Sequence, residues 1–261
     1  MPRFAANLSM LFGELDFLDR FAAAADAGFA AVEIQFPYPW PAEAIAGKLR
    51  ANDLECVLIN LPAGDWEAGD RGLACRPDRA EEFRDGITRA VDYAGVLGVP
   101  KVNCLAGIAP TDSDPVTIAA TFLGNLSLAA KALREEGREL VVEPVNTHDV
   151  PGFYLSRVEP TLTLLDRARA PVGLQLDLYH GARMGEPLPG IIRRHADRIR
   201  HVQVADMPGR HEPGTGELQL AELFDLLDEV GYDGWIGAEY RPSGKTLDGL
   251  GWLGPYRAGA A

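Results

Sequence analysis

Short apolar runs alternate with amphipathic stretches along the whole of this chain. The runs are rich in β-branched residues, which is typical of strands buried on both faces in a parallel sheet. They predict eight strands, at Phe4–Leu8, Ala31–Gln35, Glu55–Asn60, Lys101–Leu105, Glu139–Glu143, Gly173–Asp177, Ile199–Val204 and Trp235–Glu239.

Several of the stretches between these runs have apolar residues at helical spacing. They predict helices over Leu15–Ala27, Glu81–Leu97, Pro115–Glu136, Arg157–Ala168 and Leu218–Val230. Four of them are followed by a glycine suited to a helix C-cap, at Gly28, Gly98, Gly137 and Gly231.

Eight strands that alternate with helices, without a break in composition, predict one α/β domain over residues 1–261, a single (β/α)8 TIM barrel. The length of 261 residues agrees with the roughly 250 that such a barrel needs. A doubly wound open sheet is the alternative, but it requires a glycine-rich turn after an early strand. The segment Asn7–Gly13 has a single glycine, so the barrel is favoured.

Four apolar runs in the second half of the chain each lead into an oxygen-bearing side chain: Glu143, Asp177, Gln203 and Glu239. In a barrel the C-terminal ends of the strands meet at one rim, so these side chains would converge. Any one of them could be an ordinary strand-end residue, and Glu143 or Asp177 could simply cap a helix. Because three converging carboxylates repel one another unless a cation or shared protons hold them, the four together predict a metal site.

The ligand types indicate which metal this site would hold. Carboxylate oxygens and the Gln203 amide oxygen form a hard set that suits Mg²⁺, with Mn²⁺ as an alternative. A zinc site would be expected to place Cys or His at matching strand ends, and none is found there. His180 follows Asp177 by three residues, so we interpret it as a substrate contact or as a loop histidine bonded to the backbone.

A metal between two glutamates suits proton transfer next to a carbonyl group. One glutamate would remove a proton and the other would return one, with Glu143 and Glu239 as the pair. The sequence therefore favours aldose–ketose isomerisation or epimerisation through an enediolate. Hydrolysis by a serine nucleophile is disfavoured because no G-x-S-x-G turn occurs, and neither Lys101 nor Lys245 stands where Schiff-base chemistry would need it.

Two long loops should leave the rim that carries these residues. They span Leu61–Arg79 and Ala205–Glu217. Loops beyond about 12 residues in a compact domain are usually functional, so we expect lids or substrate contacts rather than flexible insertions.

Composition limits the partners. The net charge of −13 argues against nucleic-acid binding and means that an anionic substrate would need local cations in the pocket. Three cysteines without CxxC spacing, an N-terminus without a signal-peptide pattern and no expected membrane span favour a cytoplasmic protein with reduced thiols. A homo-oligomer is compatible with the sequence.

The whole chain resembles the hydroxypyruvate isomerase family of the xylose isomerase-like TIM barrel superfamily. The segments that carry the resemblance include Asn60–Trp66 (NLPAGDW), Glu143–Asn146 (EPVN), Asp177–His180 (DLYH), Pro208–Pro213 (PGRHEP) and Tyr232–Tyr240 (YDGWIGAEY). The chain departs from the related pattern at Gln203, where the sugar epimerases usually have His, at Ala182, where Gln is common, and at His148, where Arg is common.

The resemblance implies acid/base roles for Glu143 and Glu239 and metal ligands at Glu143, Asp177, Gln203 and Glu239. It implies substrate contacts at His180 and Arg210, and His148 is added as a further cation. The implied reaction interconverts hydroxypyruvate and tartronate semialdehyde. Alternatives are a 2-oxo-tetronate isomerase or ketose 3-epimerase with the same site, an inosose-type dehydratase, and a non-catalytic sugar-acid sensor.

Overall fold

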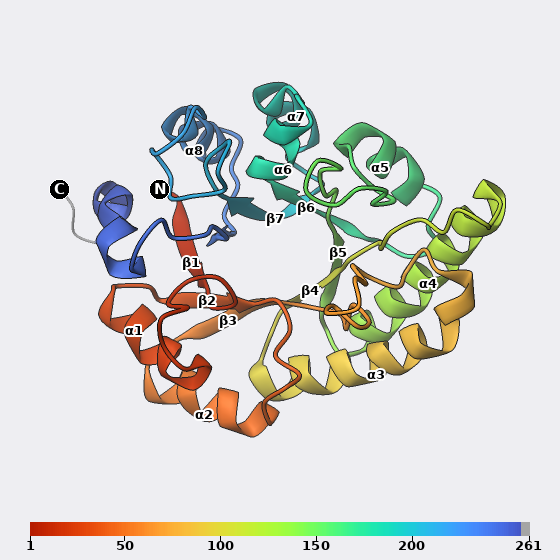
Figure 1. Ribbon diagram of the computed structural model, residues 1–261, viewed down its shortest axis with the longest axis horizontal. Coiled ribbons are helices and arrows are strands. Elements are labelled where there is room, and N and C mark those ends of the chain that lie inside the picture. Colours follow the sequence, from red (N-terminus) through yellow and green to blue (C-terminus); the bar gives the residue numbers. More distant parts are fainter. Residues whose placement is uncertain (257–261) are drawn as a thin grey trace.

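The eight strands close into a parallel barrel in chain order. In the computed structural model, which describes residues 1–256, β1 (Arg3–Asn7) pairs with both β2 (Ala31–Ile34) and β8 (Trp235–Ala238). Between them follow β3 (Glu55–Asn60), β4 (Lys101–Cys104), β5 (Glu139–Val142), β6 (Gly173–Asp177) and β7 (Ile199–Val204). The predicted TIM barrel is confirmed (Figure 1). The predicted domain of 1–261 extends into residues 257–261, which lie outside the described residues.

Helices cover the outside of the barrel (Figure 1). The predicted ones are α1 (Arg20–Asp26, after the 3-10 turn η1, Phe17–Asp19), α3 (Ala80–Leu97, after η2, Pro77–Arg79), α4 (Pro115–Glu135), α5 (Val158–Leu165) and α8 (Leu220–Glu229). The chain then runs into the 3-10 segment η3 (Thr246–Tyr256). All four predicted cap glycines have positive φ, from 68° at Gly98 to 91° at Gly28, so this prediction is confirmed.

Three further helices had no strong signal in the sequence: α2 (Ala42–Ala51), α6 (Leu178–Arg183) and α7 (Leu188–His195). Prolines just before or inside the first turn of α2 and α7 obscure the periodicity, although proline is tolerated at that place. The six-residue α6 is short and begins directly after β6, where the Asp177 carboxylate accepts hydrogen bonds from the backbone N–H groups of Tyr179 (2.7 Å) and His180 (3.2 Å). The capping role considered for Asp177 is therefore real.

Helix α4 is long and apolar enough to cross a membrane by length and composition alone, which our expectation of no such segment did not anticipate. In this structure α4 packs beside α3 and against β5. Its inward side buries Phe122, Leu126 and Leu133, and Asn125 on the same side donates to the Ala74 carbonyl (3.0 Å). The apolar character of α4 is explained by its place against the barrel.

The interior of the barrel differs from the layer between sheet and helices. That outer layer is a continuous apolar core, whereas a separate small apolar cluster contains Ala5, Ala31, Val57, Leu58 and Val141. Polar side chains are buried toward the C-terminal ends of the strands: Asn7, Glu33, Asn60, Asn103, Gln175, His201 and Gln203. Buried polar groups are tolerated only when they are hydrogen-bonded, so this interior is a network that can position a site.

Candidate active site

The floor of the site is a hydrogen-bonded network centred on Glu33 of β2. Its Oε1 accepts from the side-chain amides of Asn7 (2.8 Å) and Gln203 (2.8 Å), and its Oε2 lies 2.6 Å from His201 Nε2. Residue 237 on β8 must be glycine, because a Cβ there would lie 2.3 Å from Glu33 Oε2. The network ties β1, β2 and β7 together beneath the rim and fixes the amide of Gln203, one of the predicted site residues.

Glu143 follows β5 and is buried among neutral donors. Its Oε2 accepts from Asn103 Nδ2 (3.0 Å) and Gln175 Nε2 (3.0 Å), and Gln175 also donates to Gln203 Oε1 (2.6 Å). Burial, then the neighbouring carboxylates of Glu239 and Asp177, raise the pKa of Glu143 well above its usual range. A carboxyl group of this kind can hold a proton at neutral pH.

Glu239 follows β8 and has a cationic partner. Arg210 hydrogen-bonds Glu239 Oε2, while Oε1 accepts from Gln35 Nε2 (2.5 Å) and more weakly from Asn7 Nδ2 (3.3 Å). Burial raises the pKa of Glu239 to about 7, and Arg210 limits that rise.

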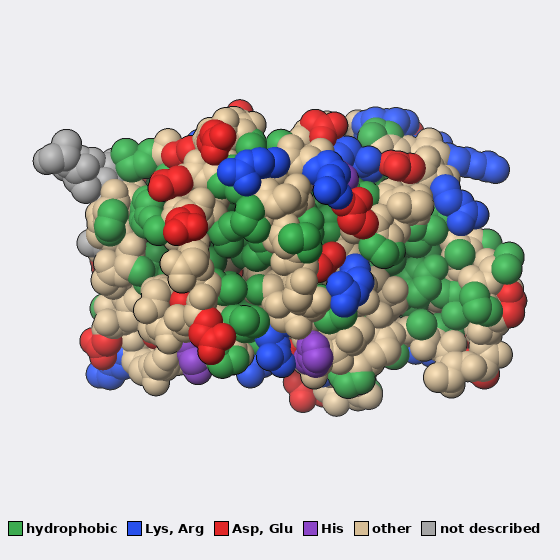
Figure 2. Space-filling model, turned by 90° about the horizontal axis from the view of Figure 1, so that it is seen from above, with side chains coloured by type: hydrophobic (Ala, Val, Ile, Leu, Met, Phe, Trp, Pro, Cys, Tyr) green, Lys and Arg blue, Asp and Glu red, His purple; other side chains and the backbone are tan. Residues whose placement is uncertain are grey.

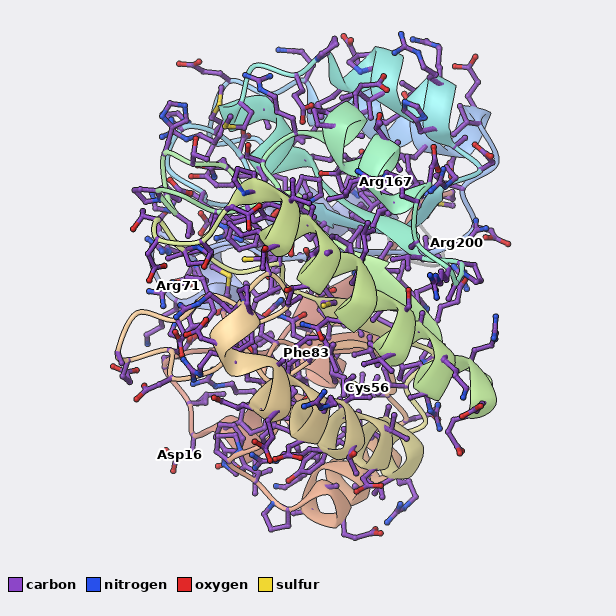
Figure 3. The ribbon with its side chains drawn as sticks, turned by 90° about the vertical axis from the view of Figure 1, so that its right-hand side faces the viewer. Asp16, Cys56, Arg71, Phe83, Arg167 and Arg200 are labelled. Atoms are coloured by element: carbon purple, nitrogen blue, oxygen red, sulfur yellow. The ribbon has the colours of Figure 1, made fainter. Side chains whose placement is uncertain are left out.

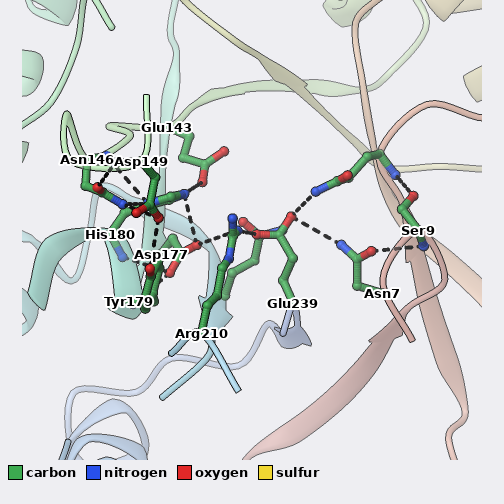
Figure 4. Close-up of polar contacts among 12 residues, drawn as sticks. Asn7, Ser9, Glu143, Asn146, Asp149, Asp177, Tyr179, His180, Arg210 and Glu239 are labelled. Atoms are coloured by element: carbon green, nitrogen blue, oxygen red, sulfur yellow. Dashed lines mark hydrogen bonds and ion pairs between the residues drawn. The ribbon is translucent and has the colours of Figure 1, made fainter. Parts of the chain in front are cut away.

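Arg210 lies between two carboxylates, as Figure 4 shows. Its Nη2 contacts Glu239 and lies 3.6 Å from Asp177 Oδ2, and its guanidinium lies 5.3 Å from the centre of the Tyr179 ring. Burial works against its charge, yet Glu239 and Asp177 raise the pKa of Arg210 above its usual range. The backbone of Arg210 is left-handed, with φ of 57°, a strained conformation for a residue with a side chain. The fold therefore maintains an unfavourable backbone where this cation is needed.

Asp177 and His180 complete the acidic side of the site. Asp177 Oδ2 is buried and has no hydrogen-bond partner among the described residues. His180 Nε2 lies 3.6 Å from that oxygen and 3.7 Å from Glu143 Oε1. Potential ligand atoms of Glu143, Asp177 and His180 all lie within 4.8 Å of one another, so this cluster could hold a metal ion.

The hydrogen bonds of His180 indicate how its ring is protonated. Burial lowers the pKa of His180 to about 4, so the ring is neutral at pH 7. Its Nδ1 faces the Asn146 backbone N–H (3.5 Å) and side-chain amide (2.6 Å), so Nδ1 is the acceptor. The proton is then on Nε2, which faces Asp177 and Glu143. As placed, His180 is a hydrogen-bond donor to the site, not the cation that we had considered as an offset for substrate charge.

A cavity of about 230 Å³ opens above these residues at the C-terminal rim. Of the predicted site residues, Glu143, His180, Arg210 and Glu239 line it, while Asp177 and Gln203 are buried beside it. Both long loops reach it, through Trp66 and Arg71 from the first and Arg210 from the second. The structure places His148 on the exposed surface, outside the lining of this cavity.

Several residues of this site were missed by the sequence analysis. They are the amide and acidic groups beneath the rim (Asn7, Glu33, Gln35, Asn103, Gln175) and two residues of the first long loop (Trp66, Arg71). A single polar residue inside an apolar run, such as Glu33 in Ala31–Ile34, is the signal that could have found the first group. The loop residues had no comparable signal, since their placement depends on the conformation of the loop.

The family model described as xylose isomerase-like TIM barrel matches residues 21–256 of this chain. This chain belongs to the xylose isomerase-like TIM barrel family. The hydroxypyruvate isomerase of Escherichia coli (strain K12) is 48% identical over 258 residues, covering 98% of this chain and 100% of that protein. A 2-oxo-tetronate isomerase of Cupriavidus necator is 46% identical, covering 98% of this chain and 99% of that protein.

Solved structures agree with this assignment. A crystal structure from Brucella melitensis, described as an AP endonuclease of family 2, is 44% identical and covers 99% of this chain and 100% of that chain, with a TM-score of 0.96. A D-allulose 3-epimerase from Methylomonas sp., at 21% identity, covers 93% of this chain and 86% of that chain with a TM-score of 0.76, and shows the fold alone. The predicted resemblance and the prediction that the chain is an enzyme are confirmed.

Proposed function

We propose that this chain is a sugar-acid isomerase that interconverts hydroxypyruvate and tartronate semialdehyde by proton transfer through an enediolate. The observation that carries the proposal is the pair of buried glutamates, Glu143 and Glu239, that face one cavity from β5 and β8. Relatives at 48% and 46% identity named hydroxypyruvate isomerase and 2-oxo-tetronate isomerase support the substrate class.

The two glutamates suit opposite halves of this proton transfer. Starting from hydroxypyruvate, Glu239 in its ionised form removes a proton from C3. The electron pair of that C–H bond forms the C2=C3 double bond of the enediolate, and the π pair of the C2 carbonyl moves to the C2 oxygen. A proton passes from the C3 hydroxyl to the C2 oxygen, the C3 oxygen forms the aldehyde carbonyl, and the C2=C3 pair takes a proton at C2 from protonated Glu143. Arg210 favours the ionised form of Glu239, while the neutral surroundings of Glu143 favour its protonated form.

A divalent metal, Mg²⁺ or Mn²⁺, fits the acidic side of the site. The buried Asp177 Oδ2 has no hydrogen-bond partner in the described chain, and the carboxylate of Glu143 lies in the same cluster. Asp177 and the unprotonated oxygen of Glu143 would hold the ion, and Gln203 and Glu239 stay predicted ligands. In this structure Gln203 Oε1 accepts from Gln175, and Glu239 pairs with Arg210. When bound, the ion would polarise the substrate oxygens and acidify the adjacent C–H bond.

The same site would act on a longer acid if the cavity admits one, so 2-oxo-tetronate isomerisation is the nearest alternative, followed by ketose 3-epimerisation and then by an inosose-type dehydration.

DNA cleavage, which the name of the Brucella melitensis protein suggests for that protein, is disfavoured here by the net charge of −13. On the face seen in Figure 2, basic side chains are interspersed with acidic ones. We propose a cytoplasmic enzyme with a small anionic substrate and without a nucleic-acid or membrane partner, and a homo-oligomer is compatible with it.

Proton NMR of the purified protein with hydroxypyruvate in D₂O tests the proposal, with added Mg²⁺, with added Mn²⁺ and with EDTA. We expect tartronate semialdehyde with deuterium at C2, formed with either metal and suppressed by EDTA. Turnover that persists in EDTA would remove the metal from the proposal but leave the two glutamates. Absence of conversion with both metals, together with conversion of a 2-oxo-tetronate, would move the assignment to the longer acid.

A further inference from the structure

Arg71, in the loop after β3 and labelled in Figure 3, is a cation that the proton-transfer site leaves unused. It lines the cavity together with Glu143 and Glu239, and its Nη1 donates to the backbone carbonyls of Trp66 (2.9 Å) and Asp70 (2.6 Å). In the described chain its Nε and Nη2 groups have no protein partner, and they are not sealed from solvent. An arginine held by one nitrogen, with the rest of its donor fork free, is prepared to bind an anion.

The loop that carries Arg71 is fixed by its own contacts. Asp70, just before it, accepts from the backbone N–H of Asp65 (2.8 Å) and pairs with Arg79 (3.2 Å). Gly72, just after it, has a φ of 118°, and a Cβ there would lie 2.4 Å from the Leu105 carbonyl oxygen. The backbone on both sides of Arg71 is therefore tied to the rest of the protein, and binding an anion would require little additional ordering.

An aromatic wall supports the guanidinium. The Arg71 guanidinium carbon lies 4.1 Å from the centre of the Trp66 ring, and that ring lies 5.1 Å from the Phe36 ring. All three line the cavity, and Trp66 remains 41% exposed although it is a large apolar side chain. Stacking keeps the planar guanidinium in one orientation, and the free indole surface is available to the carbon skeleton of a small ligand.

The other two arginines of the cavity are less suited to this task. Arg210 is hydrogen-bonded to Glu239 and lies close to Asp177, so its charge is already balanced. Arg241 is exposed, and its side chain makes no polar contact in the described part of the chain. Arg71 is thus a cation that is both fixed in place and free of an acidic partner, in a chain whose net charge of −13 would otherwise repel an acid.

We propose that Arg71 binds the substrate carboxylate and thereby selects acids over neutral ketoses. This inference rests on the proposed function, since it assigns the anchoring group for the same substrate. Arg210 then serves Glu239, and the reacting carbons of an acid anchored at Arg71 extend toward the two glutamates. Trp66 and Phe36 line the cavity beside that anchor.

Matched substrates and matched variants test the anchor. Dihydroxyacetone is hydroxypyruvate with a hydroxymethyl group in place of the carboxylate, so it shares the reacting carbons but lacks the charge. For Arg71→Gln we expect the KM for hydroxypyruvate to rise about 10- to 100-fold with kcat within about 3-fold, the range for loss of a charge-assisted hydrogen bond. The KM of Arg71→Gln for dihydroxyacetone should equal that of the unmodified protein. The KM of Arg71→Lys for hydroxypyruvate should lie between those of the unmodified protein and Arg71→Gln. Arg76→Gln, on the same loop but paired with Asp78, should behave like the unmodified protein. Equal losses on both substrates would overturn the anchor.

Binding of tartronate, a non-reacting dicarboxylate, by calorimetry separates failure of the anchor from failure of the proposed function. If hydroxypyruvate is not turned over but tartronate binds and Arg71→Gln weakens that binding by about 10- to 100-fold, the anchor stands and the reaction is wrong. If the unmodified protein binds tartronate and Arg71→Gln binds it equally well, or if the unmodified protein does not bind it, the anchor is wrong whatever the enzyme catalyses.

Discussion

Two walls of the cavity carry the same residue type in different surroundings: the wall after β5 carries Glu143, and the wall after β8 carries Glu239. On the β5 side, Glu143 accepts hydrogen bonds from the neutral amides of Asn103 and Gln175 and has the neutral His180 ring 3.7 Å away. On the β8 side, Glu239 is hydrogen-bonded to Arg210 as well as to amides. Both carboxyl groups are buried, and burial raises both pKa values, that of Glu143 well above its usual range and that of Glu239 to about 7. Burial alone would make the two groups alike, and the position of a single arginine separates them.

This difference shows how two buried glutamates can take different roles in one proton transfer. An isomerase needs one group that is ready to accept a proton and another that is ready to give one, and environments that separate two pKa values supply both. Reversal of the reaction would only exchange which group begins protonated. The comparison can be tested by replacing either glutamate and measuring turnover, by replacing Arg210, and by measuring the stability of the glutamate variants.

The largest expected effect follows from removing either carboxylate. We expect Glu143→Gln and Glu239→Gln each to lower turnover by at least ~10³-fold, because each removes one of the two proton-transfer groups. The two variants should still differ in one partial reaction. Glu143→Gln retains the base, so it should exchange the C3 protons of hydroxypyruvate with D₂O without forming product, and Glu239→Gln should not.

The measurement is NMR of the remaining hydroxypyruvate after incubation in D₂O. Near-normal turnover in either variant would contradict the two-base assignment. Exchange in Glu239→Gln but not in Glu143→Gln would reverse the roles of the two walls. Glu81→Gln, on the exposed surface of α3, is the control and should retain full activity.

A smaller effect is expected from removing the arginine that distinguishes the walls. Arg210→Met leaves Glu239 and Asp177 without their cation, so we expect kcat to fall roughly 10²-fold, the loss typical of one well-placed charged group in a site. Arg210→Lys retains the charge but loses the fork geometry, so it should recover part of the rate. Steady-state kinetics on both variants, with Arg84→Met on α3 as the surface control, would measure this. A rise in KM with kcat unchanged would show that Arg210 holds substrate and does not tune Glu239.

The barrel could be predicted from the sequence because strands buried on both faces leave short, mainly apolar runs, even where single polar residues such as Glu33 stand inside them. Each such run, from Ala31–Gln35 to Trp235–Glu239, was expected within one residue of its actual ends. The strand-end acids could be predicted for the same reason, since the fold brings those ends to one rim. Helices α2 and α7 were missed because a proline just before α2, and prolines before and inside the first turn of α7, break the pattern on which the prediction depended.

The contacts that distinguish the two walls could not be predicted in this way. Arg210 reaches Glu239 only through a left-handed backbone in a long loop, and Arg71 is placed by the close approach of Gly72 to Leu105. Neither arrangement leaves a periodic pattern. The tautomer of His180, on α6, likewise depends on Asn146, which lies in the loop after β5.

The smallest expected effect is on stability, and here the two walls should respond by different amounts. Glu143 has no ion-pair partner, so Glu143→Gln removes a buried carboxylate that is costly to ionise, and we expect the free energy of unfolding of the metal-free protein to rise by about 1 kcal/mol at pH 7.5. The pKa of Glu239 is raised as well, so Glu239→Gln relieves a cost of the same kind, but it also leaves Arg210 buried without its hydrogen-bonded partner. We therefore expect a smaller gain than in Glu143→Gln, or none.

The pH dependence of the first change follows from the direction of the Glu143 shift. Because the pKa of Glu143 is raised on folding, the unmodified protein loses stability as pH rises above the usual glutamate value of 4.5, so the gain in Glu143→Gln should be larger at pH 7.5 and shrink toward pH 4.5. Urea unfolding in EDTA at both pH values measures it, with Glu81→Gln expected to change by less than ~0.5 kcal/mol. If Glu239→Gln gained as much stability as Glu143→Gln, the arginine would not distinguish the two walls, and the assignment of Glu239 as the first base would lose its electrostatic support.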